Sequence, residues 1–236
     1  FGLMDLSGNP KDGYYYFRAL FRDEPLIHIA CSWSGTAGEK KDIVVFTNCK
    51  AAELFVNGRS LGKREKTRFG YLCWEAVPYE PGRLEAVGDD EAARDIVVTP
   101  GNACDVKLNI EHAENDILIV NAAIVDGDGN VVCDADCDLK FSAHILNDAY
   151  VTVHCEPESG YSAVINVPFT NKTHVDGMTN ETLDGANAAQ IILLGTSSGY
   201  AADHVPPHSD VRRTFNGLAQ AVFKVYNKNI VFGTVV

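Results

Sequence analysis

Short runs of apolar residues, separated by clusters of turn residues, follow one another from residue 26 almost to the end of the chain. This spacing is typical of the strands of a β-sandwich, and it differs from the alternation of strands with helices in α/β folds. A first set of strands is predicted over residues 26–31, 42–47, 53–56, 71–77, 83–87 and 94–99. A second set is predicted over residues 106–110, 117–125, 139–143, 150–154, 191–194, 218–225 and 230–235. We therefore expect an all-β chain.

The boundary between the two sets is marked by the residues Pro100-Gly101-Asn102, which favour a linker. Within the first set, Asn57-Gly58 is a strong signal for a tight hairpin turn. Two Ig-like β-sandwich domains in series are expected, over residues 25–100 and 101–236. In the second domain, the polar stretch 168–189 shows no periodicity and is predicted to be an inserted loop.

A single helix is predicted near the start, over residues 12–22, with Pro10 before it and Pro25 beyond it. One face of this helix is large and aromatic. It is formed by Tyr14, Phe17, Leu20 and Phe21. A face of this kind needs a partner surface to cover it. Tyr15 and Tyr16 fall outside it and are expected to be free to face solvent.

The charge balance excludes two classes of partner. The chain has 20 Lys and Arg against 32 Asp and Glu, for a formal net charge of -12. Nucleic-acid binders need a basic face to neutralise phosphates, and an anionic membrane surface would repel this chain. No stretch reaches the roughly 20 apolar residues of a membrane span. We predict neither a nucleic-acid nor a membrane partner.

Cysteine usage indicates reduced thiols. The seven Cys residues are an odd number, and their spacing follows no disulfide framework. Most lie within apolar runs, where a free Cys behaves as a small buried side chain. Cys133 and Cys137 could form half of a zinc site, but no second Cys/His pair follows at a suitable spacing. We interpret both as core residues and expect a reducing compartment.

A cluster of acidic residues could begin a calcium loop at Asp126, Asp128 and Asn130. The EF-hand pattern requires Gly and Glu where this chain has Val131 and Cys137. A β-turn is the better interpretation of the cluster. The sequence predicts no metal site and no cofactor.

Both tryptophans are candidates for aromatic contacts. Trp74 lies between Leu72 and Ala76 in an apolar run and is expected in the core of the first sandwich. Trp33 lies beside Gly35 at a strand end and is expected to be exposed. Since exposed aromatic rings stack on sugars, Trp33 is the candidate carbohydrate-binding residue.

Four stretches of the first half share a pattern with known enzymes. Residues 1–16, reading FGLMDLSGNPKDGYYY, resemble the end of the (β/α)8 barrel in family 2 glycoside hydrolases of the β-galactosidase type. Residues 24–29 resemble the exit from the last barrel helix. Residues 47–62 and 74–86 are similar to the domain that follows. The resemblance implies that residues 1–24 are a remnant of the last strand and helix of such a barrel.

The second half resembles the bacterial Ig-like domain that often closes these enzymes. The similar stretches are residues 125–132, 195–200 and 212–219. The chain departs from the family pattern between residues 147 and 190, and it has Ser32 before Trp33 where the family often has His.

The resemblance also implies where the chemistry lies. Retaining glycosidases use two carboxyl groups about 5–5.5 Å apart. In this family both are Glu on earlier barrel strands, so we expect them to lie before Phe1 and expect no catalytic residue here. Asn180-Glu181 mimics the Asn-Glu pair of the family's acid/base, but it falls in a polar loop and is interpreted as coincidence.

The expected function is that of non-catalytic C-terminal accessory domains, inactive alone, which brace the barrel of the same parent chain and contact carbohydrate. A carbohydrate-binding module and a structural spacer that forms homo-oligomers are the alternatives. The resemblance implies a bacterial protein. The cysteine usage favours a cytoplasmic or periplasmic location over a disulfide-rich extracellular one.

Overall fold

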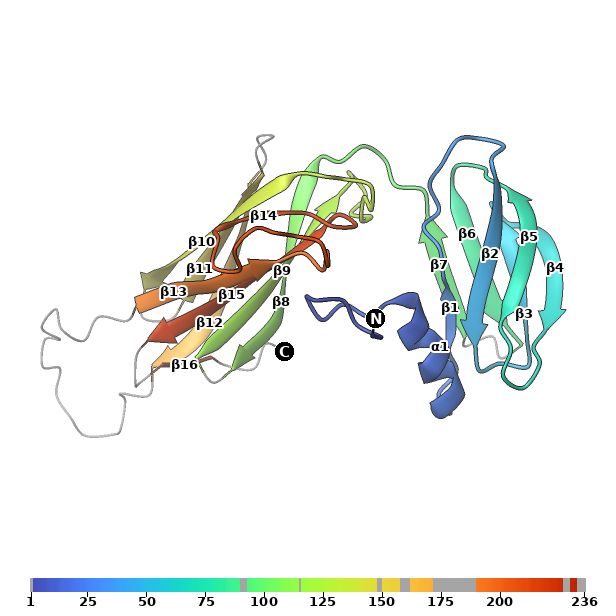
Figure 1. Ribbon diagram of the computed structural model, residues 1–236, viewed down its shortest axis with the longest axis horizontal. Helices are drawn as coiled ribbons and strands as arrows, with labels where there is room; N and C mark the ends of the chain where they lie inside the picture. Colours follow the sequence, from blue (N-terminus) through green and yellow to red (C-terminus); the bar gives the residue numbers. More distant parts are fainter. Residues whose placement is uncertain are drawn as a thin grey trace, which may run out of the picture. The chain divides into compact units, whose positions relative to one another are not determined.

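The computed structural model describes residues 2–89, 93–114, 116–147, 150–157, 162–171, 190–226 and 230–232. The chain forms two compact units, residues 1–101 and 102–236, which are called unit 1 and unit 2 (Figure 1). Both units are built from antiparallel sheets, so the all-β expectation is confirmed. The part of the chain described contains no helix long and apolar enough to cross a membrane.

Unit 1 begins with helix α1 (Asp12–Phe21), where a helix was predicted, and continues with seven strands. The strands are β1 (Ile27–Ile29), β2 (Lys40–Thr47), β3 (Ala51–Val56), β4 (Arg59–Glu65), β5 (Leu72–Pro78), β6 (Arg83–Gly88) and β7 (Arg94–Val98). They form one sheet in the order β1-β2-β5 and a second in the order β4-β3-β6-β7. Alternating burial along the strands places one face of each sheet in a shared core.

The predicted hairpin turn lies between β3 and β4. Asn57 and Gly58 both have positive φ, 49° and 81°, as a type I′ turn requires. The strand that follows, β4, was not predicted, because its residues are mainly charged and exposed. It lies at the edge of its sheet, where charged side chains are common because they prevent pairing with another chain.

Unit 2 contains nine strands within its described residues. These are β8 (Asp105–Glu114), β9 (Ile117–Val125), β10 (Asp138–Asn147), β11 (Tyr150–Pro157), β12 (Ala163–Asn171), β13 (Gln190–Ser197), β14 (Val211–Arg213), β15 (Leu218–Tyr226) and β16 (Ile230–Phe232). One sheet has the order β14-β10-β11-β12-β16 and the other β13-β15-β9-β8. The core between them includes Leu118, Val120, Leu139, Phe141 and Phe223.

Two strands of unit 2 were not predicted. β14 has only three residues, and β12 runs into the stretch that was predicted to be a loop from residue 168. β12 pairs with β11 up to Pro168 and with β16 from Phe169 to Asn171. Residues 168–171 are therefore strand, which corrects that part of the prediction. The remainder of the proposed insertion, residues 172–189, lies outside the described residues.

Candidate functional site

The predicted carbohydrate contact at Trp33 is not supported, because its side chain is only 1% exposed. Its indole N–H donates to the carbonyl oxygen of Glu80 at 3.0 Å, and its ring meets Tyr79 edge-on at 5.0 Å. The expectation of exposure was wrong because burying a large aromatic ring stabilises the fold strongly, and a neighbouring glycine does not show whether the ring is buried. Trp74, also expected in the core, is 2% exposed, which confirms its placement.

The structure separates the two cysteines that were considered together. Cys133 is exposed, so its interpretation as a core residue was wrong, whereas Cys137 is half-buried and packs against the core. Cys133 lies in a turn between β9 and β10 rather than in a strand, which the apolar run before it did not show. Among the described residues, no group of three potential ligands stands close enough to hold a metal.

The acidic cluster at Asp126 forms the predicted turn. The Oδ1 atom of Asp126 accepts the N–H groups of Asp128 and Asn130, at 3.0 and 2.9 Å. Its Oδ2 atom accepts the side-chain amide of Asn130 at 3.1 Å. Both carboxylate oxygens therefore serve the turn itself.

Helix α1 contacts the β-sandwich of unit 1 through Tyr15 and Tyr16, the side chains that were expected to face solvent. Tyr15 stacks on His28 with ring centroids 3.7 Å apart, and Tyr16 meets Phe46 at 5.4 Å. The hydroxyl of Tyr16 donates to the carbonyl of Phe69 at 2.9 Å. Burial, followed by the nearby Asp95 carboxylate, raises the pKa of Tyr15. The expectation of free tyrosines was wrong because their long side chains reach the sheet.

His28 joins the helix to the sandwich. Its Nε2 atom lies 2.9 Å from the Asp12 carboxylate at the start of α1, and its Nδ1 atom lies 3.7 Å from the Asp95 carboxylate on β7. Asp95 also accepts the backbone N–H of Ile29 at 2.8 Å. One imidazole thus connects the first turn of α1 to a strand of the opposite sheet.

The His28 contacts form one clasp, and a second clasp, made by Asn48, holds the other end of the helix. The side-chain amide of Asn48 donates to the carbonyls of Arg22 and Glu24, at 3.0 and 2.6 Å. Its oxygen accepts the N–H of Leu26 at 2.8 Å, and the Thr47 hydroxyl donates to the Leu26 carbonyl at 2.6 Å. Asn48 lies in the turn between β2 and β3. The helix exit and the sandwich are therefore fixed to each other.

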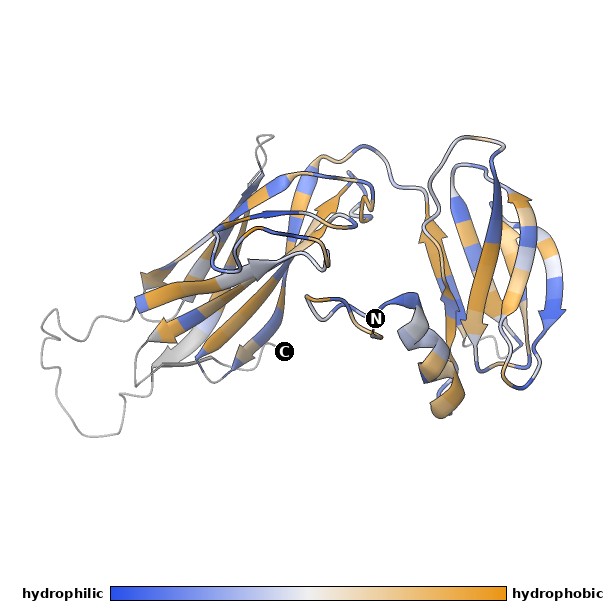
Figure 2. Ribbon diagram, in the orientation of Figure 1, coloured by the Kyte–Doolittle hydropathy of each residue, from blue (hydrophilic) through white to orange (hydrophobic). Residues whose placement is uncertain are grey.

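The opposite side of α1 is uncovered. Phe17 is 44% exposed and Phe21 is 78% exposed, and their rings stack at 6.3 Å. Figure 2 shows the apolar residues on the later turns of the helix. These two rings begin a chain of ring contacts that crosses from α1 to the β1-β2-β5 sheet. We call this chain the aromatic belt, and it comprises Tyr16, Phe17, Phe21, Phe46 and Tyr71.

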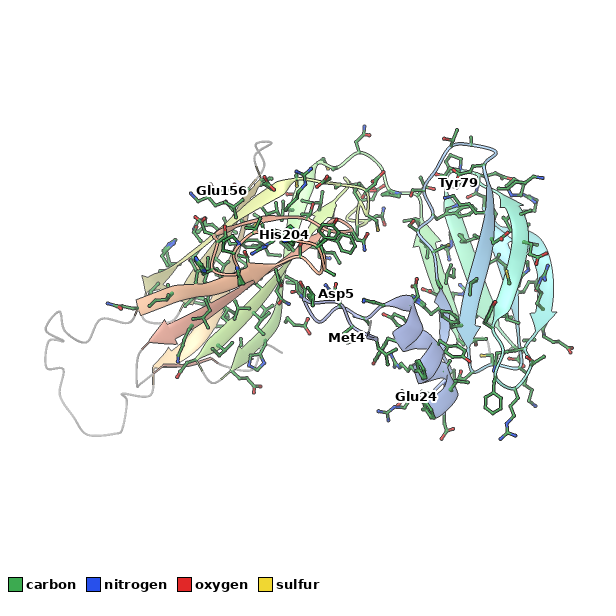
Figure 3. The ribbon with its side chains drawn as sticks, viewed as in Figure 1. Met4, Asp5, Glu24, Tyr79, Glu156 and His204 are labelled. Carbon is green, nitrogen blue, oxygen red and sulfur yellow. The ribbon has the colours of Figure 1, made fainter. Side chains whose placement is uncertain are left out.

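The segment before α1 adds further exposed apolar residues. Leu3, Met4 and Leu6 are 40%, 42% and 72% exposed. The segment is ordered by Asp5, whose Oδ1 atom accepts the N–H groups of Ser7 and Asn9, both at 2.8 Å. Figure 3 labels Met4 and Asp5 in this segment. We call residues 3–10 the N-terminal loop.

The belt and the N-terminal loop are the exposed apolar surfaces described around α1. The helical part of this surface was predicted from the spacing of Phe17 and Phe21, whereas the contributions of Phe46 and Tyr71 were missed. Both lie in runs that are typical of ordinary strands. Only the fold places Phe46 against Tyr16 of the helix and Tyr71 against Phe46.

Comparison with known proteins relates this arrangement to a family of enzymes. The profile of a domain of unknown function, DUF4982, matches residues 38–93, within unit 1. The chain is 25% identical over 235 residues to a β-galactosidase of Bacteroides ovatus, covering 95% of this chain and 25% of the relative. It is 37% identical over 147 residues to a putative β-glucuronidase of Formosa agariphila, covering 54% of this chain and 18% of that relative.

Solved structures show the same fold. A β-glycosidase from Bacteroides vulgatus superposes with a TM-score of 0.72 at 24% identity, covering 97% of this chain and 25% of that one. A glycosyl hydrolase family 2 member from Bacteroides cellulosilyticus superposes with a TM-score of 0.70 at 22% identity, covering 94% and 28%. The chain thus resembles the C-terminal region of a family 2 glycoside hydrolase, and it spans about a quarter or less of the length of the curated relatives it matches.

Proposed function

We propose that this chain is a non-catalytic accessory region of a β-galactosidase-like glycoside hydrolase. In this proposal, the aromatic belt and the N-terminal loop pack against the catalytic barrel of the same enzyme. The observation that carries it is the exposure of Phe17 and Phe21 on a helix whose other side is firmly attached to unit 1. Because the helix is fixed to the sandwich, a domain that packs on its free face is held in a fixed position relative to the sandwich.

The energetics favour a cover over this surface. Fully burying a Phe or Leu side chain contributes about 1.5–3 kcal/mol relative to leaving it in water. Phe21 and Leu6 are the most exposed large apolar side chains among the described residues of the belt and the loop, at 78% and 72%. Covering them together with Phe17 would stabilise a domain contact by several kcal/mol.

The clasps explain why such a contact would brace the barrel. The His28 contacts fix the start of α1, and the Asn48 contacts fix its exit. A contact made only through a flexible linker would leave the two domains free to move. Two attachment points instead hold α1 rigidly against the sandwich of unit 1.

The central test compares Phe21→Gln in two settings, the chain alone and an enzyme in which a barrel precedes it. In the chain alone, the midpoint of urea unfolding should stay unchanged, because the Phe21 ring already faces solvent. In the longer enzyme, the same change should lower the melting temperature and weaken hydrolysis of 4-nitrophenyl β-galactoside. Tyr150→Thr, which alters an exposed ring of unit 2, is the matched control and should affect neither.

Two further measurements separate the alternatives. Turnover of 4-nitrophenyl β-galactoside or β-glucuronide by the chain alone would refute a non-catalytic role. Sedimentation velocity of the chain alone should show a monomer. A dimer that Phe21→Gln dissociates, combined with no effect of this change in the longer enzyme, would instead assign the surface to self-association.

A further inference from the structure

Two aromatic rings of unit 2 lie outside its core and contact each other. Tyr200, in the loop after β13, is 50% exposed, and Phe215, in the turn before β15, is 37% exposed. Their ring centroids are 5.3 Å apart and their planes differ by 25°. Large aromatic side chains gain from burial, so a stacked pair left at the surface marks a contact site for another molecule.

The backbone beneath Phe215 is held in one conformation. Phe215 and Leu218 exchange two backbone hydrogen bonds, at 2.9 and 3.0 Å. The two residues between them, Asn216 and Gly217, have φ values of 54° and 72°, as in a type I′ turn. The preceding residue, Thr214, donates its hydroxyl to a backbone carbonyl at 2.9 Å. The Phe215 ring is therefore presented by a tight, bonded turn.

The loop that carries Tyr200 is anchored by a buried arginine. Arg212 is 3% exposed and donates to the Asp203 carboxylate at 2.6 Å. It also donates to the carbonyls of Val205 and Pro206, at 3.1 and 2.9 Å. The N–H of Asp203 donates to the carbonyl of Tyr200 at 3.1 Å, which closes a turn beside the ring. Because the backbone that carries both rings is already ordered, ligand binding would lose little conformational entropy.

The surroundings of the pair are mostly polar, with two exposed valines: Val205 in the Tyr200 loop and Val131 beside Gly217, at 40% and 38% exposed. His204, labelled in Figure 3, is an exposed member of the Tyr200 loop, and Asn216 is an exposed neighbour of Phe215. Ala201 and Ala202, which follow Tyr200, are exposed and short. An interface with another protein would need a wider apolar surface than two rings and two valines among polar loops.

We propose that the Tyr200–Phe215 pair is a carbohydrate-binding platform that takes one pyranose ring. A pyranose presents a face of C–H groups, which packs on an aromatic ring, and an edge of hydroxyl groups, which need hydrogen-bond partners. The Tyr200 hydroxyl is both a donor and an acceptor, and the two loops that carry the rings contain the exposed side chains of His204 and Asn216. The choice of a sugar over another ring compound rests on the proposed role within a glycoside hydrolase.

The test is an NMR titration of the chain with methyl β-galactopyranoside, methyl β-glucopyranoside and methyl β-glucuronide. We expect saturable shifts of the Tyr200 and Phe215 ring signals and of the Asn216 amide with at least one of the three. Tyr200→Ala should weaken this binding about ten-fold, as the loss of one stacking contact predicts. Phe215→Leu, which keeps an apolar side chain in the turn but removes the ring, should weaken it as well. Tyr150→Ala, which removes an exposed ring elsewhere in unit 2, should leave it unchanged.

Three outcomes would overturn the platform. The first is the absence of saturable shifts with all three glycosides while the spectrum shows a folded unit 2. The second is binding that survives Tyr200→Ala. The third is ring shifts that depend on protein concentration without sugar and disappear in Tyr200→Ala. Phe21→Gln should not change the titration, since its ring belongs to unit 1. A failure of the barrel contact and a failure of the platform are thus distinguishable.

Discussion

The side-chain amide of Asn48 donates to the carbonyl of Arg22 at 3.0 Å. Arg22 is the C-cap of α1, so a residue of the turn between β2 and β3 fixes the end of the helix. The same side chain also bonds Glu24 and Leu26. Three backbone groups of one connecting segment therefore depend on a single side chain. Removing it would leave them to water or without a partner.

Asn48→Ala should destabilise unit 1 by about 1–3 kcal/mol, because it removes three hydrogen bonds at once. The two tryptophans of the chain, Trp33 and Trp74, both lie in unit 1, so tryptophan fluorescence during urea unfolding measures this unit separately. Asn109→Ala, at an exposed position on β8, is the control and should leave the fluorescence transition unchanged. An unchanged transition in Asn48→Ala would show that the clasp contributes nothing to stability.

Trp33→Ala should destabilise unit 1 by about 3–5 kcal/mol, as expected for removing a fully buried aromatic side chain. Trp33→Phe should have a smaller effect, because it keeps most of the ring but leaves the carbonyl of Glu80 without its indole donor. Fluorescence from Trp74 reports the transition in both variants. A Trp33→Ala protein as stable as the parent would contradict the buried position and return Trp33 to the list of surface rings.

The strand set and the helix could be predicted because their signals are local. β9 shows this, because residues 117–125 form an almost continuous apolar run, as expected for a buried central strand. The Asn57-Gly58 hairpin was predictable because few residues adopt the positive φ of its turn. The Asp126 turn was predictable for a similar reason, since an Asp side chain readily bonds the N–H groups that follow it.

The site depends on contacts that no local pattern contains. Trp33 was placed on the surface because it lies beside Gly35 at a predicted strand end, yet its ring packs edge-on against Tyr79, which lies far along the chain. Tyr15 was left free because it falls outside the apolar face of α1, yet His28 lies against its ring. Burial is a property of both partners of a contact, and only the fold shows which residues those are.

Arg212 and Arg213 are neighbours with opposite environments, which makes them a matched pair. Arg212 is 3% exposed, whereas the side chain of Arg213 is 63% exposed and pairs with Asp136. Arg212→Met should destabilise unit 2 by about 2–4 kcal/mol, because it removes a buried guanidinium with its hydrogen bonds and leaves the half-buried Asp203 carboxylate without its charged partner. Arg213→Met should cause no resolvable change, because exposed ion pairs contribute little. Circular dichroism during urea unfolding follows both units, and tryptophan fluorescence follows unit 1 alone, so a shift seen by circular dichroism but not by fluorescence belongs to unit 2. Equal effects of the two changes would contradict the role of Arg212.

Unit 2 should lose stability in acid partly through Asp203. Burial alone would raise the pKa of Asp203, but hydrogen bonds from Arg212 and from the N–H of Val205 outweigh it and hold the pKa below its ordinary value. A carboxyl group whose folded pKa is lowered contributes stability above its unfolded pKa, and this contribution is lost as the pH falls through the folded pKa. The Arg213 contact lowers the pKa of Asp136 and acts in the same direction.

The measurement is the urea midpoint of unit 2 between about pH 6 and pH 3. Asp203→Asn should lower the midpoint at pH 6 and flatten its decline in acid. Asp210→Asn, at an exposed pair with Lys140, should retain the full decline. If both variants decline as steeply as the parent, the acid sensitivity arises elsewhere.

Alkylation of the seven thiols should follow their environments rather than their positions in apolar runs. Cys104 and Cys133 are exposed, and Cys155 lies in the core of unit 2. Burial, with smaller contributions from Cys137 and Glu156, raises the pKa of Cys155 to about 12, so almost none of it is thiolate at neutral pH.

Iodoacetamide at pH 8 should therefore modify Cys104 first and Cys133 next, because burial raises the pKa of Cys133 above its ordinary value. Cys31, whose pKa burial raises to about 11, and Cys155 should react only after urea unfolds the chain. Peptide mass spectrometry over time measures the order. Rapid labelling of Cys155 in the folded chain would mean that the core of unit 2 opens, and labelling of Cys31 before Cys104 would contradict the packing of unit 1.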